Sequence, residues 1–491
     1  MGLYCGGFAG MYSETALNIA LPQLSMAFGV DVSVTQWLVV GYMLVIGVVL
    51  PFAGLLMKWF SARKLTLFAL GAFLLGAIVS AAAPSFAVAF VGRAMQGIGT
   101  GLVLPITFAM VFEAFPLHKV GAAMGASALV VMFAPAIGPT LAGALVGAGS
   151  WRLVFASFAV MALVGIVFAW KFEVNPFKLT KPAIDAPSVA LSVVGFGGVV
   201  FGAGMASSYG WTSPVVLGAL VAGIVCLALY ARRQLSMEVP IIDVRIFSYQ
   251  GFRVGAVCMM VNFGITLSAM YVLPQFYQSS MLLAVALTGV VMLPGGIVNA
   301  LVSMISGRIY DRIGARGPAI CGFGLSIVGA AALLFVTPDS SLAYVVACHV
   351  IMMLGVPLAM SPCQTHALSS LPRELSADGS TALNTMQQVL GAVCTAVATS
   401  LLTAGQASYV AAGGTDATLA FTQGSHWGFA FALALAVIGF ACALCIKVKK
   451  RVNVGTGEVA AARAAAKASA ATAATGDGAS PRDVAKSGAR A

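Results

Sequence analysis

Long apolar runs, separated by short connections that hold nearly all the charge, constrain this chain more than any other feature. The 491 residues are 60% hydrophobic and only 8% charged, which leaves too little polar surface to cover a soluble globule of this size. Runs of about 20 apolar residues match a hydrocarbon core roughly 30 Å thick, and lipid offers no partner for unpaired backbone groups. The sequence therefore predicts an all-helical integral membrane protein.

Fourteen such runs are expected to be transmembrane helices. They begin near Leu3, Val34, Leu65, Phe86, Gly121, Leu153, Ser188, Ser213, Gly251, Leu282, Pro318, Ser341, Ser380 and Trp427. The first run lacks a basic flank and a cleavage site, so it does not resemble a secretory signal, and a start that omits a short basic leader stays open.

Basic residues fall on alternate connections. The other connections carry Asp31, Asp339 and Asp416 but only one basic residue, Arg152. The positive-inside rule then predicts that both termini lie in the cytoplasm, and we expect the chain to be a multi-pass protein of the plasma membrane. The net charge of +11 does not indicate a nucleic-acid partner, because the basic residues are spread over short loops rather than gathered in one patch.

An internal repeat predicts the domain organisation. Residues 54 to 65, GLLMKWFSARKL, and residues 307 to 318, GRIYDRIGARGP, each follow the second run of a block of six. We therefore expect two duplicated six-helix bundles with two extra helices inserted between them. The expected units are an N-terminal bundle over 1–170, a linker with two helices over 171–250, a C-terminal bundle over 251–446 and a disordered cytoplasmic tail over 447–491.

The connection from Arg232 to Arg253 mixes charges with large apolar residues. It is either an amphipathic segment that lies along the membrane interface or an ordinary polar connector.

Glu14 and Arg93 are the two charged residues that sit well inside apolar runs. A carboxylate near the bilayer centre costs on the order of 3 kcal/mol, so its presence indicates a function. Glu14 precedes Asn18 by four residues, which places both on one helix face. Burial favours the neutral form of a carboxylate and a nearby arginine favours its charged form, so Glu14 is a candidate proton carrier. A permanently protonated or hydrogen-bonded structural acid is the alternative.

Arg93 lies in the fourth run within RAMQGIGTG, three residues before Gln96 and on the same helix face. A guanidinium does not titrate usefully, so its expected role is to tune a nearby carboxylate. The alternative is an arginine that extends to the membrane interface.

Several other residues are candidates because of their type and position. Asn384, Gln387 and Gln388 share one face of the thirteenth run, where they either line a cavity or join helices by hydrogen bonds. His349 is a possible proton relay or a packing histidine. Glu113, near the cytoplasmic end of the fourth run, is either an interfacial residue or a site of proton release.

These features together resemble the major facilitator superfamily, in particular its fourteen-helix drug:proton antiporter branch, which includes lincomycin-type and other multidrug exporters. The resemblance covers roughly residues 1 to 450. The loop after the second helix in this family reads G-x-x-x-D-[RK]-x-G-[RK]-[RK] and holds one conformation closed. In the second half it is matched, except at Ala315, by Gly307, Asp311, Arg312, Gly314 and Arg316. In the first half Lys58 replaces the acid and Ser61 the second glycine, so an acid-dependent lock should be weak there.

Three further motifs carry the resemblance. SETALNIALP is similar to D-x-T-[IV]-V-N-x-A-L-P, but Ser13 stands at the acid position and Glu14 one residue later, a rotation of about 100° on a helix. RAMQGIGTG resembles the motif whose buried arginine takes part in proton transfer. The fifth run resembles the exporter motif G-x8-G-x3-G-P-x2-G-G, with alanine at 134 and 142. Its matching residues, which imply a helix that bends while it stays sealed, are Gly125, Gly138, Pro139 and Gly143.

Neither a nucleotide-binding loop G-x-x-x-x-G-K-[ST] nor a catalytic or zinc-binding arrangement occurs in the sequence, so we expect no enzyme and no cofactor. The resemblance implies a proton-coupled antiporter that exports amphipathic small molecules by alternating access, with small-molecule substrates, protons and membrane lipids as partners. Glu14 and Arg93 would couple protons, and Asn18, Gln96 and the residues of the thirteenth run would line the cavity. The alternatives are an exporter of one metabolite, such as an amino acid, lipid precursor or siderophore, and a membrane sensor that does not transport.

Overall fold

The computed structural model describes residues 2–114, 133–135, 137–175, 179, 185–237, 240–372 and 375–447. Its helices are α1 (Gly2–Phe28), α2 (Val32–Thr35), α3 (Trp37–Trp59), α4 (Ala62–Ala81), α5 (Phe86–Ala114), α7 (Arg152–Phe172), α8 (Ala186–Tyr209), α9 (Pro214–Ser236), η1 (Val244–Ser248), α10 (Gln250–Gln275), η2 (Phe276–Ser280), α11 (Val285–Ile313), α12 (Arg316–Leu333), α13 (Leu342–Ser369), α14 (Ser376–Ala411) and α15 (Ala417–Leu444). A shorter apolar helix, Phe133–Gly147, is called here the 133–147 helix.

Twelve helices in the described ranges are long and apolar enough to cross a membrane. The two remaining predicted runs correspond to α1, which is 27 residues long, and to the 133–147 helix. The expectation of an all-helical membrane fold is confirmed, and these two further helices agree with the expected count of fourteen. The predicted start of the fifth run near Gly121 lies outside the described residues.

The predicted start of the last helix was wrong by ten residues, because α15 begins at Ala417 rather than near Trp427. Asp416 caps the helix by accepting hydrogen bonds from the backbone N–H groups of Thr418 at 2.8 Å and Leu419 at 3.3 Å. The hydrogen bond from the Thr418 hydroxyl at 2.6 Å, together with these two backbone bonds, holds the pKa of Asp416 below its usual value. The first turns are polar, so hydropathy detects the helix only after it has begun.

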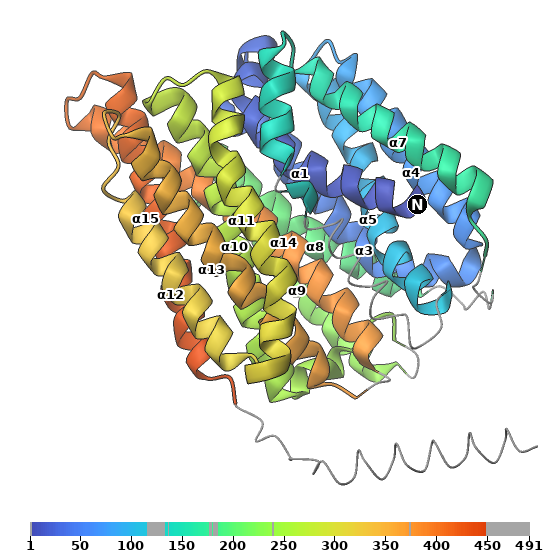
Figure 1. Cartoon of the computed structure of the whole chain (residues 1–491). Coiled ribbons are helices and arrows are strands. Elements are labelled where there is room, and N and C mark those ends of the chain that lie inside the picture. The colour runs from blue at the N-terminus through green and yellow to red at the C-terminus, as the bar shows by residue number, and fades with distance from the viewer. Residues whose placement is uncertain are drawn as a thin grey trace, which may run out of the picture. The chain divides into compact units, whose positions relative to one another are not determined.

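The helices form two groups with a hairpin between them (Figure 1). In the first group, α5 packs against α1, α3 and α4, and α7 packs against α1 and α4. In the second group, α10 packs against α13, α14 and α15, and α13 packs against α11 and α12. The hairpin consists of α8 and α9, and α8 contacts both α3 of the first group and α14 of the second.

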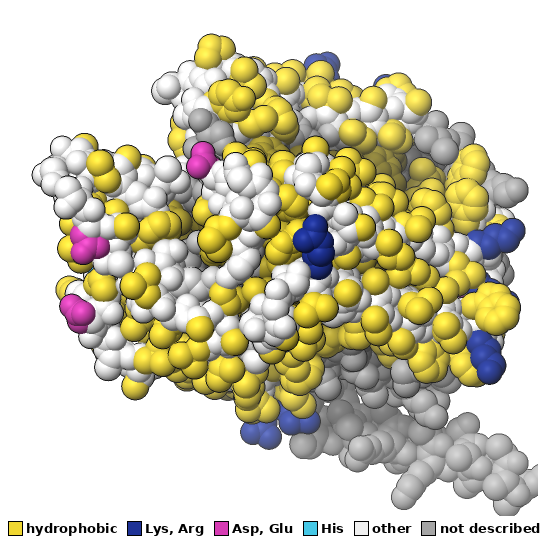
Figure 2. Space-filling model, turned by 90° about the horizontal axis from the view of Figure 1, so that it is seen from above, with side chains coloured by type: hydrophobic (Ala, Val, Ile, Leu, Met, Phe, Trp, Pro, Cys, Tyr) yellow, Lys and Arg dark blue, Asp and Glu magenta, His cyan; other side chains and the backbone are white. Residues whose placement is uncertain are grey.

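Glycines bring the two helices of the hairpin into close contact. A Cβ atom on Gly198 would lie 3.0 Å from the Cα of Gly223, so the backbones of α8 and α9 touch at this point. The outer side of α9 carries large exposed apolar side chains, which suit a lipid environment: Val215, Leu217, Val221, Ile224, Val225 and Leu229. Apolar side chains also dominate the molecular surface in Figure 2, where charged groups are sparse.

An ion pair ties the ends of the hairpin together. Arg233 of α9 donates from Nε and Nη2 to the two carboxylate oxygens of Asp185, each at 2.7 Å, and the Ser188 hydroxyl also donates to Asp185. Hydrogen bonds from Arg233 and Ser188 hold the pKa of the Asp185 carboxyl well below its usual range. A depressed pKa in the folded state stabilises the fold above the pKa of the unfolded side chain, about 3.9, and this contribution is lost as the pH falls further.

We therefore expect Asp185→Asn to lower the unfolding temperature at pH 7 by a small, salt-sensitive amount, since Arg233 is exposed. The difference from the unmodified protein should begin to shrink as the pH falls below about 4, and it should vanish only once the pH has fallen through the depressed pKa of Asp185 in the folded protein. Thermal unfolding of the detergent-purified protein over a pH series measures this, and a difference that is independent of pH would contradict it.

Because successive helices alternate in direction, their connections lie at two ends of the molecule. The N-terminal end holds the start of α1 and the connections α3–α4 and α11–α12; the opposite end holds the connections α1–α2 and η2–α11. At the N-terminal end, Ile242 and Ile246 of the connection before α10 are buried against Phe252, Met259 and Leu383. These two side chains therefore face the interior of the protein rather than lipid.

Candidate functional site

Arg93 is held at the centre of the first helix group by neutral acceptors. Its side chain is 0% exposed. Nε donates to the carbonyl oxygen of Leu38 at 2.8 Å, and Nη1 donates to Oε1 of Gln96 at 2.8 Å and to Oγ of Ser13 at 3.1 Å. Nη2 donates to the carbonyl oxygen of Ser13 at 3.3 Å. Arg93 is thus fixed within the bundle, and the alternative that it extends to the membrane interface is wrong.

The ring of Tyr42 in α3 covers the guanidinium of Arg93, whose Cζ lies 3.9 Å from the ring centroid. The Tyr42 hydroxyl donates to the carbonyl oxygen of Gly10 at 2.8 Å and lies 2.7 Å from Oγ1 of Thr100. Residues of α1, α3 and α5 therefore immobilise the arginine together. Sequence reasoning found the pair of Arg93 and Gln96 but missed Tyr42, which lies in another helix.

Replacing Arg93 by lysine should reduce the free energy of unfolding by about 3 kcal/mol. A lysine cannot reach all four acceptors of the planar guanidinium, and each lost hydrogen bond from a charged group is worth roughly 1.5 to 3 kcal/mol. Thermal or denaturant unfolding in detergent measures the loss. Arg63→Lys is a matched control, because Arg63 is exposed and, within the described ranges, its side chain donates to one backbone carbonyl, that of Trp170. Equal effects of the two substitutions would contradict the special position of Arg93.

Glu14 lies next to this network without joining it. Its side chain is 3% exposed, and neither carboxylate oxygen has a hydrogen-bond partner among the described residues. Gln388 of α14 is near enough to act on the carboxylate as a side-chain donor, and Arg93 acts on it through its charge. Gln388 therefore approaches Glu14 across the boundary between the two helix groups, although the geometry stops short of a hydrogen bond.

The one-residue displacement of the acid explains this arrangement. Ser13 stands where an acid was expected, and its hydroxyl and carbonyl oxygens both accept from Arg93. The carboxylate of Glu14 is thereby left as a buried group with no direct hydrogen bond. A charged group in such a position is costly unless it is paired, solvated or protonated.

Other buried polar atoms of the two helix groups also lack partners among the described residues. They belong in part to expected residues, namely Oδ1 of Asn18, Nε2 of Gln96, Oε1 of Gln388 and both ring nitrogens of His349. Asn384 and Gln387 are half-buried. Buried polar groups normally have a partner, so a set without one indicates a site for water or a ligand. Residues that sequence reasoning missed add to this set: Asn262, Tyr271, Gln275, Tyr277, Ser280 and Thr385.

The 133–147 helix packs closely against both helix groups. A Cβ atom on Gly138 would lie 2.4 Å from Oγ1 of Thr15 in α1, and a Cβ atom on Gly143 would lie 2.9 Å from the Cα of Gly289 in α11. Pro139, which is buried, lies between these two contacts. Thr140 donates to the carbonyl oxygen of Gly289 at 2.7 Å. Gly125 and the side chain of Glu113 lie outside the described residues.

Further hydrogen bonds join the two groups near the opposite end. Gln36 donates to the carbonyl oxygen of Thr395 at 2.9 Å and accepts from the hydroxyl of Thr399. Gln278 donates to the carbonyl oxygen of Ile19 at 3.2 Å. Together with the contact of Gly143 and Gly289, these bonds hold the two groups together at the opposite end.

The motif after α11 lies at the N-terminal end. Asp311, Arg312 and Arg316 are exposed, and a Cβ atom on Gly307 or Gly314 would meet nothing within 4 Å. Gly314 ends α11 with φ +78, a conformation that glycine adopts without strain. The motif therefore occupies the turn that the sequence predicts, with its charges accessible.

Comparison with known proteins places this arrangement in a family. The Major Facilitator Superfamily profile matches residues 3–395. The lincomycin resistance protein LmrB of Listeria monocytogenes is 39% identical over 404 residues, which cover 82% of this chain and 86% of that protein. LmrB of Bacillus subtilis is 39% identical over 412 residues, covering 84% and 86%. The multidrug resistance protein Stp of Mycobacterium tuberculosis is 27% identical over 389 residues, covering 79% and 72%.

Solved structures share the fold. The xylose transporter XylE from E. coli superposes with a TM-score of 0.60 at 12% identity, covering 92% of this chain and 97% of that one. A peptide transporter POT in complex with sulfate gives a TM-score of 0.64 at 16% identity, covering 91% and 94%. With the profile match and the 39% identity to two relatives, the chain belongs to the major facilitator superfamily of membrane transporters.

Proposed function

We propose that the protein is a proton-coupled antiporter that exports amphipathic small molecules across the plasma membrane, with both termini in the cytoplasm. In this proposal the bundles over 1–170 and 251–446 rock about a central site, and the inserted pair of helices belongs to the linker over 171–250. The relatives named for resistance to lincomycin and to several drugs support a drug as the substrate.

The observation that carries the proposal is the buried carboxylate of Glu14. It has no hydrogen-bond partner among the described residues, and it lies where a group of each bundle, Arg93 and Gln388, acts on it. A movement of the bundles would change the distance to Gln388 while the hydrogen bonds of Arg93 within the first bundle persist. The relative stability of the charged and protonated forms of Glu14 would then depend on conformation, which antiport requires.

The chemistry of the surrounding groups supports an amphipathic substrate, either cationic or neutral. Hydroxyl and amide groups that have no partner in the part of the chain that the structure describes, such as those of Asn18, Gln275 and Tyr277, offer hydrogen bonds to a polar substrate. A charged Glu14 would neutralise a bound cation, whereas a protonated Glu14 would not. Substrate and proton would therefore compete for the same carboxylate, and one would leave as the other binds.

The contacts at the opposite end support a conformation in which the site is reached from the N-terminal end. Under the proposed orientation that end faces the cytoplasm, so this conformation would load substrate. Transport would then require the contact between Gly143 and Gly289 to open and the N-terminal end to close, with the exposed motif of Asp311, Arg312 and Arg316 taking part in the closure.

The test uses the full chain in liposomes with a pH-sensitive dye inside and a proton gradient across the membrane. Addition of lincomycin, or of a lipophilic cationic dye, should accelerate proton movement, and an uncoupler should abolish accumulation of the compound. Binding of the compound without proton movement would instead identify a sensor. Proton movement with a single metabolite, and with no drug in the panel, would identify a dedicated exporter.

A further inference from the structure

A pocket lies away from the proposed transport site, between the N-terminal parts of α10 and α14. Its volume is about 400 Å³, within the range of pockets that hold small ligands. Its walls are almost wholly apolar, and η1 closes one end. The lining residues are Phe247, Arg253, Ala256, Val257, Met260, Val261, Met386 and Leu390.

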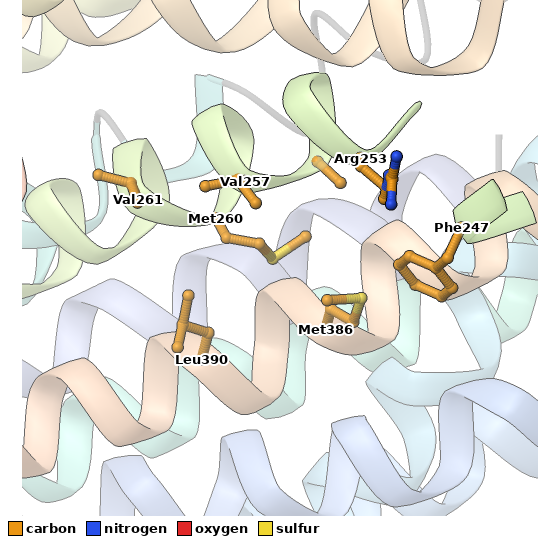
Figure 3. Close-up of a pocket in the computed structure, with 8 residues that line it drawn as sticks. Phe247, Arg253, Val257, Met260, Val261, Met386 and Leu390 are labelled. Atoms are coloured by element: carbon orange, nitrogen blue, oxygen red, sulfur yellow. The ribbon is translucent and has the colours of Figure 1, made fainter. Parts of the chain in front are cut away.

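The pocket has one charged end and one apolar end. In Figure 3, Arg253 and Phe247 lie at one end, Met260 and Met386 in the middle, and Val261 and Leu390 at the other. Arg253 precedes Val261 by eight residues, so the two ends are about 12 Å apart along α10. Among the described residues the guanidinium of Arg253 has neither a hydrogen bond nor an ion pair, whereas the side chain of the neighbouring Arg245 lies 4.0 Å from Asp243.

The position of the charge matches the membrane boundary. The candidate membrane span over Gln250–Ser280 places Arg253 in its first turn, where a basic side chain would meet lipid headgroups, and the apolar end of the pocket would then lie deeper in the hydrocarbon. Val257, between the two ends, is 45% exposed, which opens the pocket to the surroundings of the protein.

The pocket faces away from the proposed transport site. Met386 and Leu390 line the pocket from one face of α14, whereas Gln388, which approaches Glu14, lies two residues from each and therefore about 160° around the helix. A ligand in the pocket would not contact Glu14, so the pocket is a site of its own.

We propose that this pocket binds an anionic phospholipid, with one acyl chain along α10 and the headgroup phosphate on Arg253. The apolar walls accept the chain because they need no hydrogen bonds, and the unpaired guanidinium complements the phosphate. The lipid would join α10 to α14 in the leaflet at the N-terminal end. The proposal does not depend on what the protein transports.

The test is native mass spectrometry of the detergent-purified full chain with phosphatidylglycerol or with phosphatidylcholine of the same acyl chains. The unmodified protein should retain one phosphatidylglycerol about fivefold more tightly than phosphatidylcholine, which is the typical effect of one basic side chain on an anionic lipid. Arg253→Ala should remove this preference. Arg308→Ala, which removes an exposed charge at the same end but outside the pocket, should keep it.

A second pair of variants tests the acyl-chain site. Val257→Trp should fill the pocket and reduce retention of both lipids, whereas Val290→Trp, on an exposed position of α11, should change neither. Thermal unfolding confirms that each variant is folded. Equal retention of both lipids by the unmodified protein would overturn the proposal, as would a preference that survives in Arg253→Ala. Displacement of the retained lipid by lincomycin would assign the pocket to drugs and also overturn it.

Discussion

Replacing Glu14 by glutamine should abolish substrate-driven proton movement, with a loss of at least about 100-fold, while the protein stays folded. Glutamine has nearly the shape of glutamate, but its side-chain amide cannot take up or release a proton at physiological pH. The carboxylate makes no hydrogen bond among the described residues, so the substitution removes none. We expect the unfolding temperature to be unchanged or raised, since the buried charge is removed. Proton movement in liposomes and thermal unfolding in detergent measure the two effects.

A matched control is available in Glu173, which lies after α7 and accepts a hydrogen bond from Thr66 at 2.7 Å. Burial raises the pKa of Glu173, but the residue lies at the N-terminal end and outside the proposed site. Glu173→Gln should keep substrate-driven proton movement. If Glu14→Gln retained this movement, Glu14 would not be the proton carrier. If both variants lost it, the effect would not be specific to Glu14.

Replacing Gly143 by valine should reduce transport by about tenfold or more, because the substitution forces the two helix groups apart at the opposite end. A Cβ atom at this position would lie 2.9 Å from the Cα of Gly289 and from the carbonyl oxygen of Val285, and neither backbone atom can rotate away. The variant should therefore favour the conformation in which the opposite end is open. Transport in liposomes measures the loss.

The change of conformation can be measured separately. Ala286 faces Gly147 across the same contact, where a Cβ atom on Gly147 would lie 2.6 Å from that of Ala286. A cysteine at 286 should react faster with a membrane-impermeant thiol reagent when Gly143 is valine. Gly218→Val is the control, because a side chain there meets nothing within 4 Å. Slow transport without faster labelling would mean that the valine disturbs packing but not the closure.

Much of the fold was predictable because lipid imposes one rule on every helix. A span must be long and apolar, and charges must lie in the connections, so hydropathy alone places most helix starts within a few residues. The rule fails where a helix begins in polar sequence. At α15 the cap of Asp416 sets the start, and Thr418 and Thr422 delay the apolar run.

The site was predictable only in part. Glu14 and Arg93 stand out because charge is rare inside apolar runs, and Gln96 and Asn18 follow from helical spacing. Contacts between distant segments leave no such signal. Gly289 of α11 packs against Gly143, and the ring of Tyr42 covers Arg93. Both contacts depend on tertiary packing, so the spacing of residues along the chain does not reveal them. Polar residues of α10 such as Asn262 and Gln275 did carry a signal, since they interrupt an apolar run.

The hairpin of α8 and α9 has a mechanical consequence. Its first helix touches α3 on one side and α14 on the other, and the glycine contact and the ion pair of Asp185 with Arg233 make its two helices one stiff unit. If the two bundles rock as proposed, such a unit cannot move with both neighbours at once. It would stay with one and slide along the other, and that sliding surface would then contribute to the barrier for each transport cycle.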